Sequence, residues 1–341
     1  MPAPEGLARR RIGRTGPDVT FAGFGAVQVG NLFRFVTEEE SRQVIDAAWD
    51  AGLRYFDTAP LYGFGLSELR IGQALRWRDR DDFVLSSKVG RVLEPGRCAP
   101  QDAAPWVRPA AFRPVYDYSY DGTMRAFEQS LQRLALERMD ICFIHDIDVW
   151  THGNRQPEMF DQAMNGAWKA LARLKDEGVL KAIGVGVNEW QVCRDALLRR
   201  DFDCFLLAGR YTLLEQDALD GFFPLCRERG ASVIVGGGFN SGILATGAVP
   251  GARYNYHEAP PEILARVAGI EAVCRGFDVP LQAAALQFVT AHPAVASFVT
   301  GTRSAEQLRQ NVGWLTTSIP AGFWAQLKHD GLLRADAPTP A

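Results

Sequence analysis

Four polar side chains occupy positions from which they could work as one chemical unit. Asp57, Lys88 and His145 each stand near the carboxyl end of a short apolar segment that has the composition of a β-strand, and Tyr62 follows Asp57 on the next loop. Alone, each has a structural explanation, such as a turn-capping acid or a hydrogen-bonded histidine. Because the carboxyl ends of the strands in a parallel barrel meet at one rim, we predict that all four converge there.

An acid, a phenol, an amine and an imidazole together suit hydride transfer to or from a carbonyl carbon. Reduction leaves an alkoxide that needs a proton, and oxidation of a hydroxyl needs a base for the same proton. A free tyrosine has a pKa of about 10, and a nearby ammonium favours its phenolate. We therefore predict that Lys88 lowers the pKa of Tyr62 and that Asp57 holds Lys88 protonated. His145 is expected to donate a hydrogen bond to the substrate oxygen.

The elements that must position these residues alternate between strand and helix. Amphipathic stretches with apolar residues at three- and four-residue spacing fall at 38–52, 123–136, 162–178 and 305–315. Short segments rich in β-branched and apolar residues fall at 21–26, 53–59, 83–89, 139–146, 182–188, 204–211, 232–238 and 295–301. Such alternation predicts an α/β protein with a parallel sheet. Eight units favour a closed (β/α)8 barrel over a doubly wound sheet, so we expect one domain spanning 1–341.

The sequence lacks the usual dinucleotide-binding turn. Gly23 and Gly25 could begin one, but Gln28 stands where the third glycine belongs, so the G-x-G-x-x-G spacing is not met. Two loops, 90–118 and 147–158, exceed the usual length of connections between strands and helices. Both follow strands, so in a barrel they would lie on the catalytic rim as lids or binding walls.

Composition excludes several classes of function. The chain of 341 residues carries 37 basic and 40 acidic side chains, scattered rather than gathered in blocks, which argues against nucleic-acid and membrane partners. The six cysteines form no C-x-x-C pair, so we expect neither a redox dithiol nor a metal site. No apolar segment follows the charged amino-terminal stretch, and no run of eighteen apolar residues occurs later, so a cytoplasmic protein is expected.

Five segments resemble the signature segments of the aldo-keto reductases, in the family's order and across most of the chain. They are FDTAPLYG (56–63), SSKVG (86–90), DICFIHD (140–146), GVGVN (184–188) and VTGTRSAEQLRQN (299–311). The resemblance implies a (β/α)8 TIM barrel with an amino-terminal β-hairpin, here expected within 10–22. It also implies that the cofactor binds without a Rossmann turn and that the catalytic tetrad is Asp57, Tyr62, Lys88 and His145.

The same resemblance implies which residues contact a nicotinamide cofactor. Asn188 would bind the carboxamide, backbone at Gly25 would approach the ribose, and the segment that begins at Thr300 would bind the adenosine end. Relatives often carry a stacking aromatic ring where this chain has Gly236, so Phe239 or Tyr211 would have to supply one. The expected cofactor residues are Gly25, Ala26, Asp57, Asn188, Tyr211, Gly236, Gly238, Phe239, Thr300, Gly301, Thr302, Arg303, Ser304, Gln307 and Asn311.

NAD is the expected cofactor, with NADP the less favoured choice. Members of the family that prefer NADP commonly place basic residues against its 2′-phosphate, where this chain has Gly301 and Gln307. Only Arg303 could supply a bidentate partner, and it would have to swing in to do so.

Within the family, four further segments are most similar to bacterial aldose 1-dehydrogenases, which act on sugars such as L-fucose or D-threo-aldoses, and to pyridoxal 4-dehydrogenases. These segments are YDYSYDG (116–122), HDIDVWTHG (145–153), AGRYTLLEQ (208–216) and GGGFNSGIL (236–244). Both groups oxidise a cyclic hemiacetal to a lactone with NAD. We expect the aldose reaction on a small-molecule substrate, with contacts from Tyr62, His145, Trp150 and Asn240.

Three other readings of the sequence stay open. The chain could oxidise pyridoxal, or it could reduce carbonyl compounds generally. A third alternative is a cofactor-bound regulatory subunit without catalytic activity, because a retained barrel does not by itself fix function. A monomer or a small homo-oligomer is expected.

Overall fold

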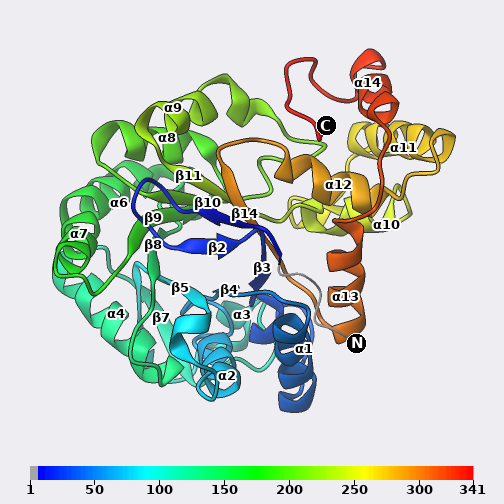
Figure 1. Cartoon of the computed structure of the whole chain (residues 1–341). Coiled ribbons are helices and arrows are strands. Elements are labelled where there is room, and N and C mark those ends of the chain that lie inside the picture. The colour runs from blue at the N-terminus through cyan, green and yellow to red at the C-terminus, as the bar shows by residue number, and fades with distance from the viewer. Residues whose placement is uncertain (1–6, 341) are drawn as a thin grey trace.

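A closed barrel of eight parallel strands forms the centre of the computed structural model, which describes residues 7–340 (Figure 1). Each of the eight segments predicted as strands contains one barrel strand, so the predicted (β/α)8 fold is confirmed. In order around the barrel the strands are β3 (Ala22–Gly25), β4 (Tyr55–Asp57), β5 (Val84–Val89), β8 (Ile141–His145), β9 (Ala182–Val187), β10 (Cys204–Ala208), β11 (Ser232–Gly236) and β14 (Val295–Thr300).

Helices form the outer layer of the molecule (Figure 1). The first begins at a capping box in which the Thr37 hydroxyl accepts from the Glu40 N–H and the Glu40 carboxylate accepts from the Thr37 N–H. The long helices are α1 (Glu38–Asp50), α2 (Leu66–Leu75), α4 (Tyr120–Leu134), α6 (Gln156–Gln162), α7 (Trp168–Asp176), α8 (Trp190–Arg199), α9 (Phe222–Arg229), α11 (Pro261–Gly276), α12 (Leu281–Thr290), α13 (Ala305–Trp314) and α14 (Ala321–His329). The short ones are α3 (Pro100–Ala103), α5 (Val149–His152) and α10 (Ile243–Thr246).

Alternation along the strands decides which side chains point into the barrel. Tyr55, Val84, Ile141 and Phe143 belong to the cluster that fills the barrel, whereas Phe56, Leu85, Cys142 and Ile144 pack in the layer between strands and helices. Successive side chains of a strand point to opposite faces. Asp57, Lys88 and His145 each follow an inward side chain by an even number of residues, so they too point inward, at the carboxyl end of the barrel.

The predicted amino-terminal hairpin closes the opposite end. Its strands are β1 (Arg9–Arg11) and β2 (Asp18–Thr20), and Figure 1 shows β2 across the opening of the barrel. Ile12 and Val19 from this hairpin join the apolar cluster inside the barrel. The hairpin also meets the amino ends of strands, because Gly13 N–H donates to the Ser232 hydroxyl at 2.9 Å. The mouth at the carboxyl ends of the strands is therefore the end left for chemistry.

The two loops predicted at the rim contain regular structure of their own. Within 90–118, β6 (Arg91–Pro95) pairs antiparallel with β7 (Phe112–Tyr116). The loop 147–158 contains α5, a 3-10 turn and the start of α6. A hairpin that we did not predict, β12 (Arg253–Tyr254) with β13 (His257–Glu258), follows β11. Trp150 lies 6.3 Å from His257 between ring centroids, so this hairpin meets the loop after β8.

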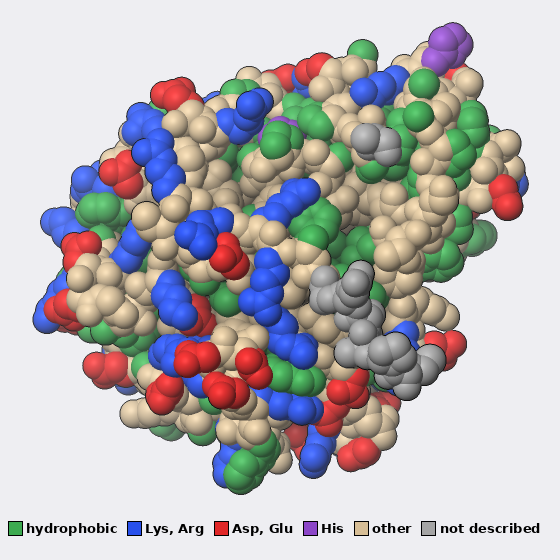
Figure 2. Space-filling model, in the orientation of Figure 1, with side chains coloured by type: hydrophobic (Ala, Val, Ile, Leu, Met, Phe, Trp, Pro, Cys, Tyr) green, Lys and Arg blue, Asp and Glu red, His purple; other side chains and the backbone are tan. Residues whose placement is uncertain are grey.

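Charged side chains of both signs are mixed over the face that carries the amino-terminal hairpin (Figure 2). Across residues 7–340, no helix combines the length and the apolar character that crossing a bilayer requires.

Candidate active site

Lys88 and Asp57 form a buried ion pair at the carboxyl ends of β5 and β4. The Nζ of Lys88 lies 2.8 and 3.0 Å from the two carboxylate oxygens and donates to the Thr58 carbonyl at 2.8 Å. The two residues are 1% and 2% exposed. Burial alone would lower the pKa of Lys88, but Asp57 and then Tyr62 outweigh it and raise that pKa. The amine is therefore held as an ammonium.

The ring of Tyr62 lies against this pair. The Nζ of Lys88 is 4.8 Å from the ring centroid, and Trp106 packs on the ring with 5.9 Å between centroids. The turn that carries Tyr62 presses on Gly30, where an added Cβ would stand 2.7 Å from the Tyr62 carbonyl carbon. A side chain at position 30 would therefore displace this turn, and the Tyr62 ring with it, from the Lys88 ammonium.

Burial dominates the proton affinity of Tyr62. It raises the pKa of the phenol to about 12, although the Lys88 ammonium pulls that pKa down, and Asp57 adds to the rise. The prediction that Lys88 brings the pKa of Tyr62 below its ordinary value of about 10 is therefore wrong for the protein without cofactor. Loss of water destabilises the phenolate more than the Lys88 ammonium stabilises it, so Tyr62 keeps its proton at neutral pH in that state.

The imidazole of His145 faces Tyr62 across the mouth of the barrel. The ring centroids are 6.1 Å apart and the ring planes stand at 83°. Burial first, then the charges of Arg91 and Lys88, lower the pKa of His145 well below 6.5. The imidazole is therefore neutral, and a neutral imidazole can donate one hydrogen bond to an oxygen.

Two residues that the sequence reasoning missed stand behind His145. The guanidinium of Arg91 donates to Asp146 Oδ2 at 2.7 Å and lies 3.2 Å from His145 Nδ1. Arg91 is only 5% exposed. A signal was present, because Arg91 follows Lys88 by three residues and Asp146 directly follows His145. Charged residues in loops are usually solvated, so residue type alone does not distinguish these two positions.

The residues expected to bind the ribose lie beside the tetrad. Thr300 on β14 pairs with Phe24 on β3, and Gly25 pairs with Asp57 on β4. The Ala26 N–H donates to the Asp57 carbonyl at 2.8 Å. Backbone at Gly25 and Ala26 thus lies on the rim between Thr300 and Asp57.

Asn188 lies on the other side of the tetrad. His145 pairs with Gly186 across β8 and β9, so Asn188 follows at the rim. Its backbone N–H donates to Asp148 Oδ2 at 3.0 Å, and the residue is partly exposed. A side-chain amide at this point fits a carboxamide, because each group both donates and accepts hydrogen bonds.

The segment 300–311 has features that fit the phosphate and adenosine end of a dinucleotide. Thr302 is 2% exposed, and its hydroxyl has no hydrogen-bond partner among the described residues. Ser304 caps α13 by accepting from the Gln307 N–H at 3.2 Å. The remaining N–H groups of a first helical turn favour an anion. Gly301 and Gln307 are exposed and Asn311 is partly exposed, so this side of the rim is accessible.

Arg303 is already engaged with the loop after β3. Its Nε donates to Gln28 Oε1 at 2.8 Å, and its backbone N–H donates to Gln307 Oε1 at 3.2 Å. To reach a 2′-phosphate, the guanidinium would have to leave Gln28.

The structure corrects the prediction for Tyr211. This ring is 0% exposed and packs against Phe223, Phe288 and His292, with centroid separations of 4.6, 5.1 and 5.8 Å. It has no open face, so it cannot stack on a nicotinamide without repacking of the core. Phe239 is partly exposed beyond β11, after Gly236 and Gly238, and stays a candidate.

Asn240 is also misassigned by the sequence. It is 2% exposed, its Nδ2 donates to the Gly209 carbonyl at 3.2 Å, and its Oδ1 accepts from the Thr212 hydroxyl. Because both ends of the amide are used inside the protein, the predicted substrate contact is wrong. Trp150 is 48% exposed at the rim and stays a candidate.

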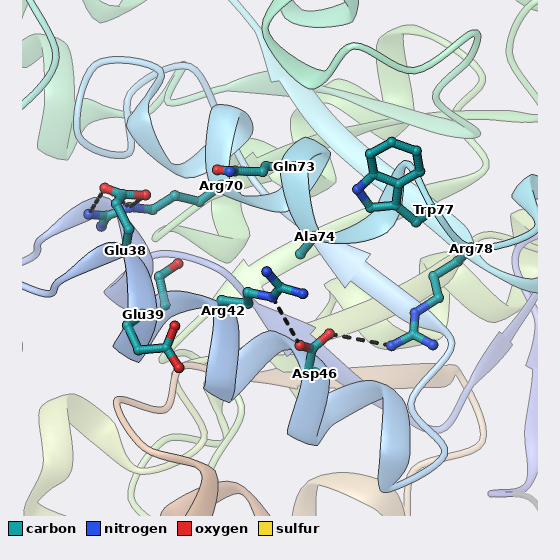
Figure 3. Close-up of a pocket in the computed structure, with 10 residues that line it drawn as sticks. Glu38, Glu39, Arg42, Asp46, Arg70, Gln73, Ala74, Trp77 and Arg78 are labelled. Carbon is teal, nitrogen blue, oxygen red and sulfur yellow. Dashed lines mark hydrogen bonds and ion pairs between the residues drawn. The ribbon is translucent and has the colours of Figure 1, made fainter.

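A cleft of about 470 Å³ lies outside the barrel, between α1 and α2 (Figure 3). Ion pairs line it: Asp46 is 3.5 Å from Arg42 and 3.3 Å from Arg78, and Arg70 is paired with Glu38. None of the predicted site residues lines this cleft. Most of its charges are paired with one another, and the cleft shares no lining residue with the tetrad.

Comparison with known proteins agrees with the geometry at the mouth. A family model described as "Aldo/keto reductase family" matches residues 22–329. The chain belongs to the aldo/keto reductase family. The chain is 43% identical to pyridoxal 4-dehydrogenase of Microbacterium luteolum, over 95% of this chain and 98% of that protein. It is 40% identical to D-threo-aldose 1-dehydrogenase of a Pseudomonas species, over 93% and 94%.

Solved structures are similar over almost the whole chain. The holo form of an aldo-keto reductase from Bacillus halodurans has a TM-score of 0.74 and 26% identity, covering 97% of this chain and 98% of that one. A glycerol dehydrogenase from Gluconobacter oxydans, at 19% identity and a TM-score of 0.73, covers 98% and 97% and shares the fold. The family match and these relatives identify the protein as an NAD(P)-dependent oxidoreductase, and the resemblance drawn from the sequence is confirmed.

Proposed function

We propose that this enzyme uses NAD to oxidise the hemiacetal carbon of an aldose, of the L-fucose or D-threo-aldose type, to a lactone. One observation carries the proposal: Tyr62, the Lys88–Asp57 pair and the neutral His145 meet at the open end of the barrel. Support for the substrate class comes from the two relatives of about 40% identity, which are named for pyridoxal and D-threo-aldose.

Oxidation of a cyclic hemiacetal removes a hydride from the anomeric carbon and a proton from its hydroxyl, which becomes the lactone carbonyl. Bound oxidised nicotinamide would supply the hydride acceptor and a positive charge close to the phenol. Tyr62 accepts the proton, and Lys88 stabilises the phenolate that does so. His145 donates a hydrogen bond to the same substrate oxygen and holds it against Tyr62.

The cofactor would lie along the arc of rim from β14 to β9. In this proposal Asn188 binds the carboxamide, backbone at Gly25 approaches the ribose, and the Thr302 hydroxyl with the start of α13 binds the phosphates and adenosine; the rim position of each residue supports it. The engagement of Arg303 with Gln28 supports NAD over NADP, because Arg303 is the single basic residue in the segment 300–304 that could pair with a 2′-phosphate.

Pyridoxal is the second candidate substrate, and it also forms a cyclic hemiacetal. The relative named for it is the more similar of the two, at 43% identity. Aromatic rings gather near the mouth, with Trp106 on Tyr62 and Trp150 at 6.5 Å from Tyr256. The internal use of Asn240 removes one polar partner that a sugar would have had, and flat aromatic walls suit a pyridine ring.

The other two readings have weaker support. Carbonyl reduction is represented by an NADH-specific methylglyoxal reductase of Escherichia coli at 26% identity. The regulatory alternative is represented by a probable voltage-gated potassium channel subunit beta of Arabidopsis thaliana at 23%. A complete tetrad and more similar dehydrogenases favour an enzyme that oxidises hemiacetals.

The test is a substrate screen with NAD and NADP. L-fucose, D-arabinose, L-galactose and pyridoxal are each incubated with the protein, and formation of the reduced cofactor is followed by absorbance. We expect turnover of at least one aldose, a larger kcat/KM with NAD than with NADP, and a rate that rises between pH 7 and 10, because Tyr62 must first lose its proton. Pyridoxal turnover alone would select the second candidate.

Tyr62→Phe is the matched variant for the same screen. It should lower kcat on the best substrate by about a hundredfold or more, because it removes a positioned proton acceptor, and should leave the Kd for NAD nearly unchanged. Turnover by Tyr62→Phe close to that of the unmodified protein would contradict the proposed role of the phenol. No turnover on any of the four substrates would discard the substrate class.

A further inference from the structure

A second buried ion pair stands at the barrel mouth beside the first. Arg91 Nη2 lies 2.7 Å from Asp146 Oδ2, and the two side chains are 5% and 12% exposed. The Lys88 pair lies against Tyr62, whereas the Arg91 pair lies against His145. Each of the two side chains expected to hold the substrate oxygen therefore has its own buried cation.

The contact between Arg91 and His145 decides which ring nitrogen carries the proton. Arg91 Nη1 is 3.2 Å from His145 Nδ1. A guanidinium has only N–H donors and keeps its protons, so Nδ1 must accept. The proton of the neutral ring is then on Nε2. Asp146 Oδ1 is 3.5 Å from Nε2, longer than an ordinary N–H···O bond, so this N–H stays available.

The surroundings of Arg91 hold it in this place. Its Nη2 also donates to the Tyr116 hydroxyl at 2.8 Å, and the guanidinium lies 4.4 Å from the centroid of that ring. The backbone behind it is fixed as well, because the Tyr118 hydroxyl lies 2.8 Å from the carbonyls of both His145 and Asp146. Asp146 adopts a φ of 52°, a conformation that neighbouring contacts must enforce.

We propose that Arg91 is a positioning residue for His145. It holds the imidazole as the Nε2–H tautomer and keeps a second proton off the ring, so that one N–H is always presented to the substrate oxygen. The inference deepens the proposed function, since it rests on His145 binding that oxygen. The titratable and charged groups around the imidazole are Tyr62, Lys88, Arg91, Tyr116, Tyr118, Asp146 and His152.

Removal of Arg91 should reverse the balance of charge at the ring. In the unmodified protein Arg91 and Lys88 both oppose protonation of His145. In Arg91→Met, Asp146 loses this ion-pair partner and is left as an unpaired carboxylate 3.5 Å from Nε2, which favours an imidazolium. Nδ1 also loses its donor, so either tautomer can form.

Nitrogen NMR of the imidazole rings measures the tautomer and the protonation of His145 directly, and it requires no substrate turnover. The His145 signals are identified by their loss in His145→Gln. In the unmodified protein they should show a bare Nδ1 and a protonated Nε2, unchanged from pH 5 to 9. In Arg91→Met they should titrate within that range or show both tautomers. An Arg91→Met ring with the same tautomer and no titration would overturn the proposal.

Kinetics of paired variants separate positioning from a merely structural role. Arg91→Met should lower kcat by about tenfold or more, while in a His145→Gln background the same change should alter kcat by less than about twofold. An equal loss in both backgrounds would assign Arg91 a structural role only. Arg91→Lys, which keeps a cation beside Asp146, should restore part of the activity and suppress the titration.

The matched control is an arginine with an 11% exposed side chain at the opposite end of the same strands. Arg80 pairs with Asp140 at 2.6 Å, and Asp140 Oδ2 accepts from the Leu85 N–H at the start of β5. Arg80→Met should lose stability but keep kcat and the His145 signals. If the screen finds no substrate, the tautomer measurement still stands, so failure of this inference and failure of the proposed function are distinguishable.

Discussion

The Lys88 ammonium is the charge on which proton transfer at Tyr62 depends, and its removal gives a prediction with a magnitude. The Nζ lies 4.8 Å from the ring centroid, which at an effective dielectric constant of about 20 corresponds to ~3.5 kcal/mol of attraction for a phenolate. Each 1.36 kcal/mol is roughly a tenfold change in rate. Lys88→Met should therefore lower kcat for hemiacetal oxidation by roughly 300-fold.

The single variant also leaves Asp57 buried without a partner, which costs about 3–5 kcal/mol of stability. Combining Lys88→Met with Asp57→Asn removes both charges. It also retains an acceptor for the Ser86 hydroxyl, which in the unmodified protein donates to Asp57 Oδ1 at 2.7 Å. The double variant should regain most of the unfolding free energy while kcat stays low. Urea unfolding and initial rates at saturating NAD measure the two quantities.

Lys175 and Asp203 offer a matched control. They form an ion pair with similar distances, 2.6 and 2.7 Å, between α7 and the residue before β10, with Lys175 more exposed than Lys88 at 32%. The double variant Lys175→Met with Asp203→Asn should keep kcat within about twofold. The reasoning is refuted if the folded Lys88→Met, Asp57→Asn protein binds NAD and turns over within tenfold of the unmodified enzyme.

Two further predictions concern stability. Burial, with a smaller effect from Arg227, lowers the pKa of His292 to about 4, so the stability that its neutral form supports is present above pH 6.5 and is lost as pH falls toward 4. In thermal unfolding, Tm should therefore fall less between pH 6.5 and 4.5 in His292→Asn than in the unmodified protein. His329→Asn, a change at an exposed histidine, should behave like the unmodified protein. Gly90 has a φ of 106°, and an added Cβ would stand 2.3 Å from the Tyr118 ring. Gly90→Ala should therefore lower the free energy of unfolding in urea by about 3 kcal/mol or more. Gly276→Ala, at a position with open space around it, should leave that free energy unchanged.

Periodicity along the strands explains why much of the site could be predicted. Asp57, Lys88 and His145 each lie an even number of residues after an inward apolar side chain, namely Tyr55, Val84 and Phe143. A closed parallel barrel then brings them to one rim, irrespective of the conformation of the loops. The barrel and the meeting of Asp57, Lys88 and His145 at one rim follow from local pattern, whereas the hairpin at the base of the barrel is implied only by the family resemblance.

Packing between distant segments explains what could not be predicted. Whether the Tyr211 ring has an open face depends on Phe288 and His292, which lie far along the chain, and the engagement of Asn240 depends on Gly209 and Thr212. The proton affinity of Tyr62 depends on how much water its neighbours exclude. None of these has a signature in residue type or spacing.

The four-residue run from Lys88 to Arg91 anchors both halves of the site, because one end holds Asp57 and the other holds Asp146. Anyone grafting a rim loop from a relative onto this scaffold should therefore splice beyond Val92 and before Val115, two residues that face each other across β6 and β7. A junction any closer to the barrel would shift the phenol and the imidazole together, so libraries for new substrates are best confined to the outer part of that hairpin.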